Sequence, residues 1–426
     1  MPLLFWLIQS YTLFWSGVYM TYIKRTLEKS ILQMSQFFPA VLVTGPRQVS
    51  KTTILKNCES NSRTYVSLDS LDNRTLAQND PAMLLQNFPA PVLIDEIQYA
   101  PQLLPYIKIQ IDKHQQPGMF WLTGSQQFHL MKNVTESLAG RMGILQLQGL
   151  SQTEKDGNRS ALPFLPTEQY IKTQAVNAPE ADIIKVYERI WKGSYPKLYP
   201  ADNIHWETFY ESYLQTYIER DIRTLSTIHK ELDFLKFMRS LAARTGQMLN
   251  YKAMADDVDV SAPTLKEWLS VLQASNLIYI LSPYFNNIGK RFIKTPKVYF
   301  LDTGLASYLT GWKTPETLRE GAMSGAMFET YAVSEILKSY WHNGKQPNIY
   351  YYRDKEGQEI DVLLEENGTF YPVEIKKKTN PTKEDIRHFS ILEKLQLKQG
   401  TGAVLCMGTN PLSITQNVQR IPITYL

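Results

Sequence analysis

Short apolar runs alternate with longer helical patterns in the first part of the chain. Four such runs, at residues 40–44, 64–68, 91–94 and 120–123, have the composition of buried strands. The stretches between them place apolar residues at helical spacing. Strands that alternate with helices predict βαβ units and a mainly parallel sheet. We therefore expect an α/β domain over residues 20–165.

The pattern then becomes helical and rich in aromatic residues over 180–310, after a Pro-, Asn- and Gln-rich stretch at 157–179 that we expect to be a linker. Ser261 is placed to cap a helix whose apolar positions follow at helical spacing, at Leu265, Trp268, Leu269 and Leu272. A short helix at 251–257 precedes it and a strand follows. This order resembles a winged helix, whose second helix would enter the major groove of DNA.

A third part of the chain, residues 320–426, returns to mixed helices and strands, with a hairpin signal at Asn367-Gly368. The 426 residues are enough for about three domains, in agreement with the three patterns. The hydrophobic share of 43% and the charged share of 20% are those of a globular protein, which excludes a disordered or collagen-like chain.

Charge and cysteine content narrow the picture further. The net charge is only +4, so a nucleic-acid partner would have to contact a local basic cluster. The best candidate cluster consists of Lys290, Arg291, Lys294 and Lys297. Two cysteines are too few for a disulfide framework or a cysteine-based zinc site, and they favour a reducing compartment. We therefore expect a cytoplasmic protein.

Residues 1–19 form an apolar extension without a charged side chain. The extension lacks the basic start and the small-residue end of a signal peptide, and polar residues dilute it as a membrane span. Three interpretations stay open: residues upstream of a natural start at Met20, a packed N-terminal helix, or a membrane anchor. We do not expect a membrane partner for the rest of the chain.

A glycine-containing loop follows the first predicted strand. Its residues have the spacing of a P-loop, and they are Gly45, Pro46, Arg47, Gln48, Val49, Ser50, Lys51, Thr52 and Thr53. In such a loop the backbone N–H groups hold the β-phosphate of a nucleotide, the lysine neutralises phosphate oxygens and the threonine hydroxyl binds Mg²⁺. Ser50 stands where the pattern has a second glycine, and at positive φ it would cost about 1–3 kcal/mol.

Two further strand ends support a site for ATP and Mg²⁺. Asp95 and Glu96 follow an apolar strand, where Asp95 can hold Mg²⁺ and Glu96 can polarise the attacking water. Ser125 lies in a polar stretch, 123–126, that follows the next strand and is placed to sense the γ-phosphate. An ordinary Gly/Pro turn is the alternative for the loop alone, and the order of the three elements argues against it.

Several strings over roughly residues 20–380 resemble a family of AAA+-type ATPases of bacteria and archaea that carry domain of unknown function 4143. They include Val-Thr-Gly-Pro-Arg-Gln at 43–48, Leu-Ile-Asp-Glu-Ile-Gln at 93–98, Leu-Thr-Gly-Ser-Gln at 122–126, Glu-Ser-Leu-Ala-Gly-Arg at 136–141 and Tyr-Phe-Leu-Asp-Thr-Gly-Leu at 299–305. The resemblance implies ATP hydrolysis with the roles given above. It also suggests Arg141 as a sensor or trans-acting arginine, and it leaves a homo-oligomer open. An ordinary salt bridge is the alternative for Arg141.

The third part of the chain places two carboxylates opposite each other. If Asn367-Gly368 is a two-residue turn, the numbers of facing residues sum to 735, which pairs Asp361 with Glu374. Facing Cβ atoms lie about 4.5–5.5 Å apart, and like charges there are destabilising unless a cation compensates them. Lys376 lies on the same face as Glu374. A single bulge would shift this register.

The spacing of these three residues also resembles the pattern of PD-(D/E)XK nucleases. That resemblance implies Mg²⁺ on Asp361 and Glu374, and a water-orienting or charge-stabilising role for Lys376. Glu329 lies on an apolar helical stripe and matches the glutamate that such nucleases often carry on their first helix, so the resemblance implies that it is a further metal ligand. The alternatives are a nuclease-like fold without activity and a surface hairpin with scattered charges.

The expected fold is α/β: an AAA+-like P-loop NTPase with a parallel sheet, then a winged-helix helical domain, then a PD-(D/E)XK nuclease-like domain over 320–426. We expect an ATP-binding and ATP-hydrolysing protein that acts on or with DNA. The alternative is a regulator or adaptor that is switched by a nucleotide and whose last domain binds DNA or protein without catalysis.

Overall fold

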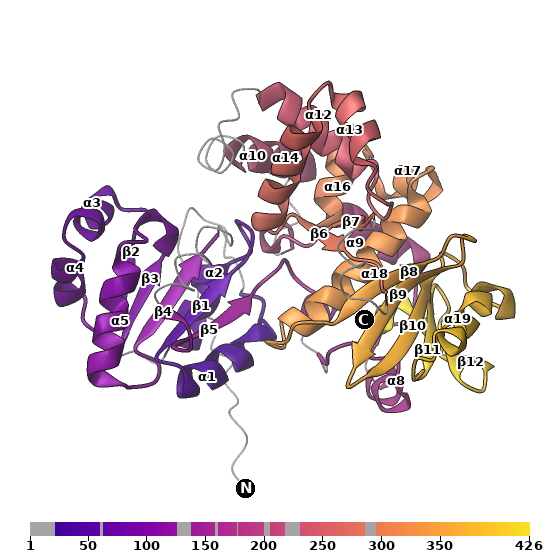
Figure 1. Cartoon of the computed structure of the whole chain (residues 1–426), viewed down its shortest axis with the longest axis horizontal. Coiled ribbons are helices and arrows are strands. Elements are labelled where there is room, and N and C mark those ends of the chain that lie inside the picture. The colour runs from indigo at the N-terminus through magenta and orange to yellow at the C-terminus, as the bar shows by residue number, and fades with distance from the viewer. Residues whose placement is uncertain are drawn as a thin grey trace, which may run out of the picture.

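The computed structural model describes residues 22–59, 63–125, 138–157, 161–176, 178–199, 205–217, 231–285 and 295–426. The extension at 1–19 lies outside the described residues, as do Lys290, Arg291 and Lys294 of the expected basic cluster. The interpretations of both therefore stay predictions. Figure 1 shows a parallel-sheet part and a C-terminal sheet on opposite sides of the molecule, with a helical part above the second sheet.

The first sheet has five parallel strands in the order β2-β3-β4-β1-β5. The strands are β1 (Ala40–Thr44), β2 (Thr64–Ser67), β3 (Val92–Asp95), β4 (Phe120–Gly124) and β5 (Met142–Gln146). The first four confirm the strands predicted from the apolar runs, and the parallel βαβ arrangement is confirmed with them. The edge strand β5 was not expected.

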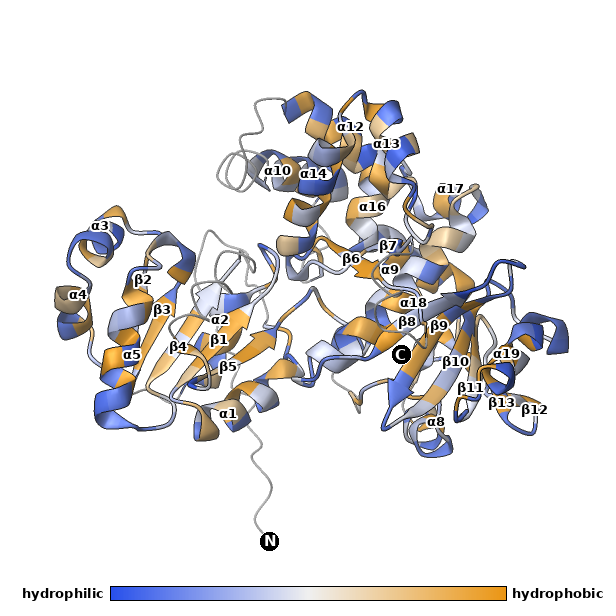
Figure 2. Ribbon diagram, in the orientation of Figure 1, coloured by the Kyte–Doolittle hydropathy of each residue, from blue (hydrophilic) through white to orange (hydrophobic). Residues whose placement is uncertain are grey.

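Helices cover both faces of this sheet because successive side chains of β1 point in opposite directions. Leu42 packs in one apolar cluster with the buried face of α5, whereas Val41 and Val43 pack in a second cluster with α1 and α2. The helices of this part are α1 (Leu27–Phe37), α2 (Lys51–Cys58), α3 (Leu71–Asn79), α4 (Pro81–Asn87), α5 (Leu103–His114) and the 3₁₀ turn η1 (Ile97–Tyr99). Figure 2 shows the strands as mainly hydrophobic and the outer helices as mixed.

The segment after β5 is docked onto the C-terminal part of the chain. It contains the short helices α7 (Gln152–Lys155) and α8 (Glu168–Ala175). Tyr170 donates a hydrogen bond to the Tyr425 carbonyl at 2.7 Å, and the Phe164 N–H donates to Ser339 Oγ at 2.9 Å. The described residues of the stretch at 157–179 are therefore packed against the C-terminal part, and the assignment of this stretch as a linker stays a prediction.

The helical part contains seven described helices and a two-stranded antiparallel sheet. Ser261 caps α14 as predicted, since it accepts a hydrogen bond from the Thr264 N–H at 3.2 Å. The helices are α9 (Ile183–Lys192), α10 (Trp206–Tyr217), α12 (Glu231–Ala242), α13 (Tyr251–Val258), α14 (Ala262–Ala274), α16 (Thr303–Leu309) and α17 (Pro315–Glu320), with the turn η2 (Pro196–Leu198) and the strands β6 (Ile278–Leu281) and β7 (Lys297–Phe300). Two helices followed by a ribbon are what a winged helix requires, and that assignment stays a prediction.

The C-terminal part places a long helix against a six-stranded sheet. The strand order is β12-β13-β11-β10-β9-β8, with β8, β9 and β10 antiparallel and β10, β11 and β13 parallel. The elements are α18 (Ser324–Trp341), β8 (Ile349–Arg353), β9 (Glu359–Glu366), β10 (Thr369–Ile375), η4 (Lys383–Ser390), α19 (Ile391–Lys394), β11 (Gly402–Cys406), β12 (Leu412–Thr415), β13 (Val418–Pro422) and η5 (Ile423–Tyr425).

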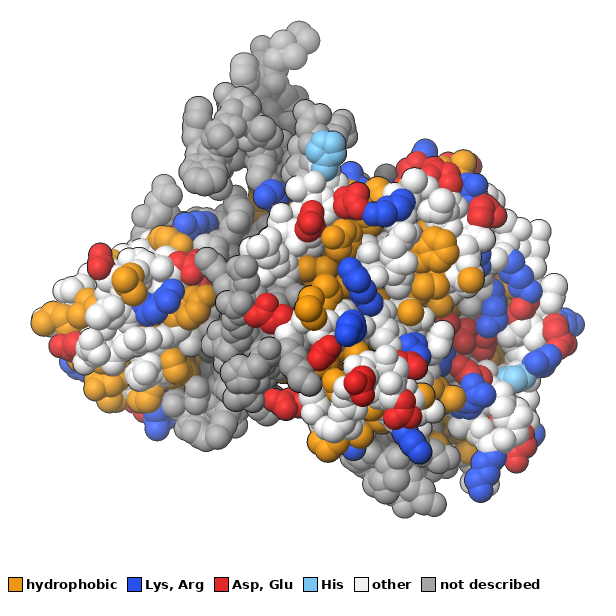
Figure 3. Space-filling model, turned by 90° about the horizontal axis from the view of Figure 1, so that it is seen from above, with side chains coloured by type: hydrophobic (Ala, Val, Ile, Leu, Met, Phe, Trp, Pro, Cys, Tyr) orange, Lys and Arg blue, Asp and Glu red, His pale blue; other side chains and the backbone are white. Residues whose placement is uncertain are grey.

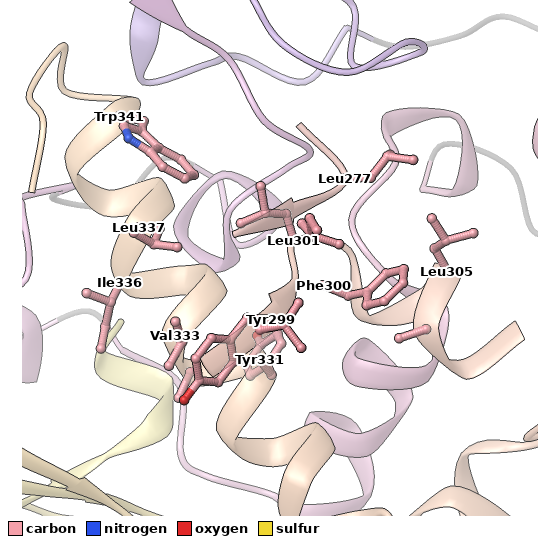
Figure 4. Close-up of a cluster of buried hydrophobic side chains, with 14 of the residues drawn as sticks. Leu277, Tyr299, Phe300, Leu301, Leu305, Tyr331, Val333, Ile336, Leu337 and Trp341 are labelled. Carbon is pink, nitrogen blue, oxygen red and sulfur yellow. The ribbon is translucent and has the colours of Figure 1, made fainter. Parts of the chain in front are cut away.

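The helix α18 joins the parts of the molecule, since its residues pack on β7 of the helical part and on β10 of the C-terminal sheet. Figure 4 shows Val333 and Leu337 of α18 on the side of the helix that faces Tyr299 and Leu301 from the segment of β7, and Ile336 on the other side. One apolar cluster runs from α1 through the helical part to η5. Among the described residues, no helix has the length and apolar content needed to cross a bilayer.

Candidate functional site

The predicted phosphate loop connects β1 to α2 at the carboxyl end of the parallel sheet. Gly45 has a φ of 147°, and a Cβ atom at this position would lie 1.9 Å from the carbonyl oxygen of Leu147. Only glycine fits there. Ser50 has φ 70° and ψ 36°, in the left-handed region, and immediately precedes α2. The structure thus places Ser50 in the conformation for which its pattern position normally has glycine.

Lys51 is buried, with 6% of its surface exposed. Its ammonium group donates hydrogen bonds to the carbonyl oxygens of Gly45 at 3.1 Å and Pro46 at 2.9 Å. The lysine therefore lies against the inner side of the loop, where a P-loop lysine meets the phosphates of a nucleotide.

The predicted magnesium residues meet directly. Thr52 Oγ1 donates a hydrogen bond to Asp95 Oδ1 at 2.7 Å. Asp95 is 6% exposed and also accepts hydrogen bonds from Thr123 Oγ1 and from the hydroxyl of Tyr65. Thr123 and Tyr65 come from the strands on either side of β3. They hold the Asp95 carboxylate toward the loop.

Glu96 follows at a left-handed position, with φ 59°. Its backbone N–H donates to Thr123 Oγ1 at 2.9 Å, and its carboxylate accepts hydrogen bonds from Gln98 and Ser125. Ser125 thus lies next to the candidate catalytic carboxylate, and its predicted contact with the γ-phosphate stays a prediction. Gln126 lies outside the described residues.

These residues line an open cleft of about 390 Å³, which is large enough for part of a nucleotide. Its walls are formed by Arg47, Gln48, Ser50, Lys51, Thr52, Thr53, Glu96 and Thr216. Thr216 comes from α10, so the helical part borders the candidate nucleotide site. Pro46 and Val49 contribute through their backbone: the Pro46 carbonyl bonds to Lys51, and the Val49 carbonyl accepts a bond from Arg25.

Arg141 lies at the amino end of the parallel strands, opposite the end that carries the phosphate loop. It precedes β5, and its carbonyl oxygen accepts a bond from the N–H of Ala40, at the start of β1. Its guanidinium group forms two hydrogen bonds to Asp112 of α5, at 2.6 and 3.2 Å. Arg141 therefore does not face the phosphate loop of its own chain, and a trans-acting role stays a prediction.

The hairpin register in the C-terminal sheet is the one predicted. Asn367 and Gly368 have φ values of 51° and 72°, as a type I′ turn requires. The facing pairs run from Thr369 with Glu366 to Val373 with Val362. The next pair in the same register is Asp361 and Glu374.

Lys376 bridges these two carboxylates. Its ammonium nitrogen lies 3.2 Å from Asp361 Oδ2 and 2.6 Å from Glu374 Oε2. Burial, and after it the charge of Asp361, raise the pKa of Glu374 to about 9. Burial opposes ionisation of Asp361 too, but Lys376 and Lys297 outweigh it and lower the pKa of Asp361. Of the two carboxyl groups, Asp361 is therefore the one that ionises more readily.

A second lysine-bridged pair lies beside the first. Lys297 of β7 is 5% exposed at its side chain, and its ammonium nitrogen lies 3.2 Å from Glu329 Oε1 and 2.6 Å from Glu359 Oε1. Tyr299 donates a 2.6 Å hydrogen bond to Glu329. Burial and the charge of Asp361 raise the pKa of Glu329. The expectation that Lys297 contacts phosphate as part of an exposed basic cluster is wrong, because this lysine is buried.

We call this group, Glu329, Glu359, Asp361 and Glu374 with Lys297 and Lys376, the acid cleft. It borders an open cavity of about 450 Å³ lined by Glu359, Asp361, Glu374, Lys376, Glu384, Asp385, Arg387 and His388. His388 accepts a 2.9 Å hydrogen bond from the Glu359 N–H. The sequence interpretation missed Glu359 and His388. The two-residue spacing of Glu359 and Asp361, which puts both on one face of β9, could have identified the first.

A buried polar junction connects the phosphate loop to α18, and it was also missed. Arg25 is 2% exposed and donates to the carbonyl oxygens of Val49 and Gln148 and to Glu154. Burial alone would raise the pKa of Glu154, but the charge of Arg25 and, after it, the interaction with His342 lower this pKa well below its usual range. His342 Nε2 accepts a 3.1 Å bond from the Gln148 N–H. These contacts fix the end of the parallel sheet against the C-terminal part.

Three segments of the chain match the models of known protein families. The model of an AAA domain matches residues 38–155, the domain of unknown function 8612 matches 184–316, and the domain of unknown function 4143 matches 324–426. The chain is also 29% identical over 392 residues to Uncharacterized protein Rv2008c of Mycobacterium tuberculosis and to Uncharacterized protein Mb2031c of Mycobacterium bovis. Each match covers 90% of this chain and 80% of the relative.

Solved structures show weaker similarity. The Walker-type ATPase PABY2304 of Pyrococcus abyssi is 15% identical with a TM-score of 0.40, over 66% of this chain and 94% of that chain. A point variant of RuvB from Thermotoga maritima is 19% identical with a TM-score of 0.26, over 60% of this chain and 85% of that chain. Scores this low support no conclusion about this chain, and the family models carry the assignment. Residues 38–155 match an AAA domain and residues 324–426 match the domain of unknown function 4143, which confirms the resemblance predicted from the sequence strings.

Proposed function

We propose that the AAA domain binds ATP together with Mg²⁺ and hydrolyses it. The hydrogen bond from Thr52 to Asp95 supports this proposal, because it brings together a hydroxyl and a carboxylate that hold Mg²⁺ in P-loop NTPases. Lys51 would neutralise phosphate oxygens. Glu96 lines the same cleft, and its bonds to Gln98 and Ser125 hold its carboxylate where it can polarise a water molecule.

We further propose that the C-terminal domain is nuclease-like and holds a divalent cation on Asp361 and Glu374. The observation that carries this proposal is the register of the β9–β10 hairpin, which brings both carboxylates and Lys376 to one open cleft. Lys376 neutralises the negative charge of the two carboxylates only in part, because the pKa of Glu374 is still raised to about 9. A bound cation would supply the charge that allows Glu374 to ionise.

The number of ligands fits Mg²⁺. Among the described residues, no three His, Cys, Asp or Glu side chains are grouped so that they could hold a metal ion together. Mg²⁺, however, is often held by one or two carboxylates and keeps several water molecules. Asp361 and Glu374 provide that number. When bound, the ion would polarise a phosphodiester group, and the Lys376 ammonium, which is about one-third exposed, would stabilise the developing negative charge.

DNA is the substrate that we propose for this cleft. On the described part of the face in Figure 3, basic side chains are interspersed with acidic ones. Contact with DNA on this face would therefore depend on single basic residues and not on a broad basic surface. The helix α14 exposes Lys266, Glu267 and Gln273, a mixed set that suits weak contact with a groove. Arg387, on the rim of the acid cleft, is placed for contact with a phosphate.

A nucleotide-switched regulator or adaptor is the alternative, and one observation favours it. Lys376 already bonds to both Asp361 and Glu374, an arrangement that could hold the hairpin together without any catalysis. In that case the C-terminal domain would be a DNA- or protein-binding platform, connected to the AAA domain through the buried junction of Arg25 and Glu154.

Plasmid cleavage by the purified chain in Mg²⁺ or Mn²⁺ separates the two functions. Cleavage that is lost in Asp361→Ala and in Glu374→Ala, but kept in Glu366→Ala, would support the nuclease. Glu366 is a suitable control because it is an exposed carboxylate on the same hairpin. Absent cleavage, or equal cleavage by all variants, would support the regulator instead.

A further inference from the structure

The acid cleft has two pairs of carboxylates, Glu329 with Glu359 and Asp361 with Glu374. The negative charges of the two pairs are neutralised to different degrees by neighbouring donors. Glu329 accepts a hydrogen bond from Tyr299 and pairs with Lys297, while Glu359 pairs with Lys297 and with Arg353 at 2.7 Å. Both carboxylates share Lys297, and each has one further side-chain donor of its own, Tyr299 for Glu329 and Arg353 for Glu359. Asp361 and Glu374 instead share Lys376, and the other donor to Asp361 is the backbone N–H of Ile375.

The two lysines also differ in how firmly they are held. The Lys376 side chain is 34% exposed and can turn into the open cavity when another cation arrives. The Lys297 side chain is 5% exposed, and its backbone is fixed because β7 pairs with β6 and belongs to the helical part. Displacing Lys297 would leave a buried ammonium group without its carboxylates, which costs much more than turning an exposed side chain.

We propose that Lys297 is a built-in cation that occupies the Glu329–Glu359 half of the acid cleft, so that the cleft takes a single divalent cation, between Asp361 and Glu374. This inference rests on the proposed metal site of the C-terminal domain. It gives Glu329 a partner in place of the metal that its sequence position predicted. It also makes the cleft a composite site, because a strand of the helical part supplies the cation.

Counting Mn²⁺ bound to the full chain without nucleotide tests the inference. Free Mn²⁺ is measured by electron paramagnetic resonance, and bound Mn²⁺ is obtained by difference. The number of ions still bound by Asp361→Asn is subtracted from the number bound by each other variant, because those ions lie outside the cleft. We expect one cleft ion in the unchanged protein and two in Lys297→Met, with the added ion lost again when Glu359→Gln is combined with it. Lys297→Arg keeps the charge and should keep the count at one. Lys313→Met, which removes an exposed lysine paired with Glu207, is the matched control and should also bind one.

A second measurement does not depend on the folding of Lys297→Met. Glu329→Gln and Glu359→Gln in the otherwise unchanged chain should each keep one cleft ion with an affinity within about threefold, whereas Glu374→Gln should weaken it at least tenfold. Loss of the ion in Glu329→Gln or Glu359→Gln would overturn the inference, as would two cleft ions in the unchanged protein or a count of one in folded Lys297→Met. If Asp361→Asn loses no ion at all, the proposed metal site itself is refuted, and the inference falls with it.

Discussion

Replacing Ser50 with glycine should stabilise the AAA domain. Ser50 lies in the left-handed region and makes no side-chain hydrogen bond to the N-terminus of α2, so its hydroxyl contributes no helix cap. A residue with a Cβ atom is disfavoured in this region by about 1–2 kcal/mol. Glycine adopts it freely but loses about 0.5–1 kcal/mol more backbone entropy on folding. The net gain in the free energy of unfolding should be about 0.5–1 kcal/mol.

Nucleotide affinity should respond differently, because Ser50 holds the left-handed conformation that the glycine of a phosphate-binding loop adopts at this position. A strain that is equal in the free and the bound protein cancels in the free energy of binding. The affinity for ATP should therefore change by less than about threefold. A gain of tenfold, which is about 1.4 kcal/mol, would mean that the serine side chain obstructs the phosphate.

Urea unfolding of the full chain measures the stability change, with midpoints compared at equal m-values. Ser50→Ala is the matched control because alanine keeps the Cβ atom and hence the strain, so its stability should stay close to that of the unchanged protein. If Ser50→Gly instead lowers the free energy of unfolding by about 0.5–1 kcal/mol, which is the usual effect of glycine at negative φ, the reasoning is refuted.

Four further predictions concern the two candidate sites. Gly45→Ala should abolish ATP binding, because the added Cβ would lie 1.9 Å from the Leu147 carbonyl oxygen; an unchanged affinity in calorimetry of the folded variant would contradict this. Lys51→Ala should lower ATP affinity at least about 100-fold, or about 2.7 kcal/mol, while Lys56→Ala on the same helix should not; equal affinities would exclude a P-loop. Mn²⁺ affinity of the acid cleft should rise about tenfold per pH unit between about pH 6 and 8. The reason is that the pKa of Glu374 is raised to about 9, so this group must release a proton when the ion binds. An affinity that does not change with pH would contradict that pKa. By the same linkage, the contribution of Glu374 to the free energy of unfolding is fully present below its ordinary pKa of 4.5 and is lost as the pH rises through about 9. In Glu374→Gln the free energy of unfolding should therefore fall less steeply between these two pH values.

Features that depend on neighbouring residues could be predicted from the sequence. The phosphate loop is one continuous string, and the strand before it and the helix after it follow from local apolar patterns. Asp361 and Glu374 are 13 positions apart, but a two-residue turn fixes which residues face each other. Each feature lies within two elements that follow each other in the chain. In the hairpin, the short turn leaves little freedom in which residues of the two strands face each other.

Features that depend on packing between distant segments could not be predicted. The sequence places Lys297 next to Lys294 and Arg291, which indicates a basic cluster. The structure instead buries Lys297 against Glu329 and Glu359, and nothing local to residue 297 specifies those partners. Likewise Arg25 meets Glu154 across 129 positions, and it satisfies the carbonyl oxygens that follow β5. Buried charges of this kind are recognised only when their partners are known.

The position of α18 explains why both candidate sites belong to one unit. Glu329 near its start reaches the acid cleft, and His342 just after its end bonds to the segment that follows β5. His342 follows Glu329 by thirteen positions, which is about 20 Å along a helix, and apolar side chains pack along this length (Figure 4). A packed helix moves as a rigid body rather than bending continuously. If the nucleotide controls the acid cleft, the control should therefore act by shifting α18 as a whole against residues 147–157, and substitutions at the Arg25–Glu154 contact should change that coupling while leaving each site intact.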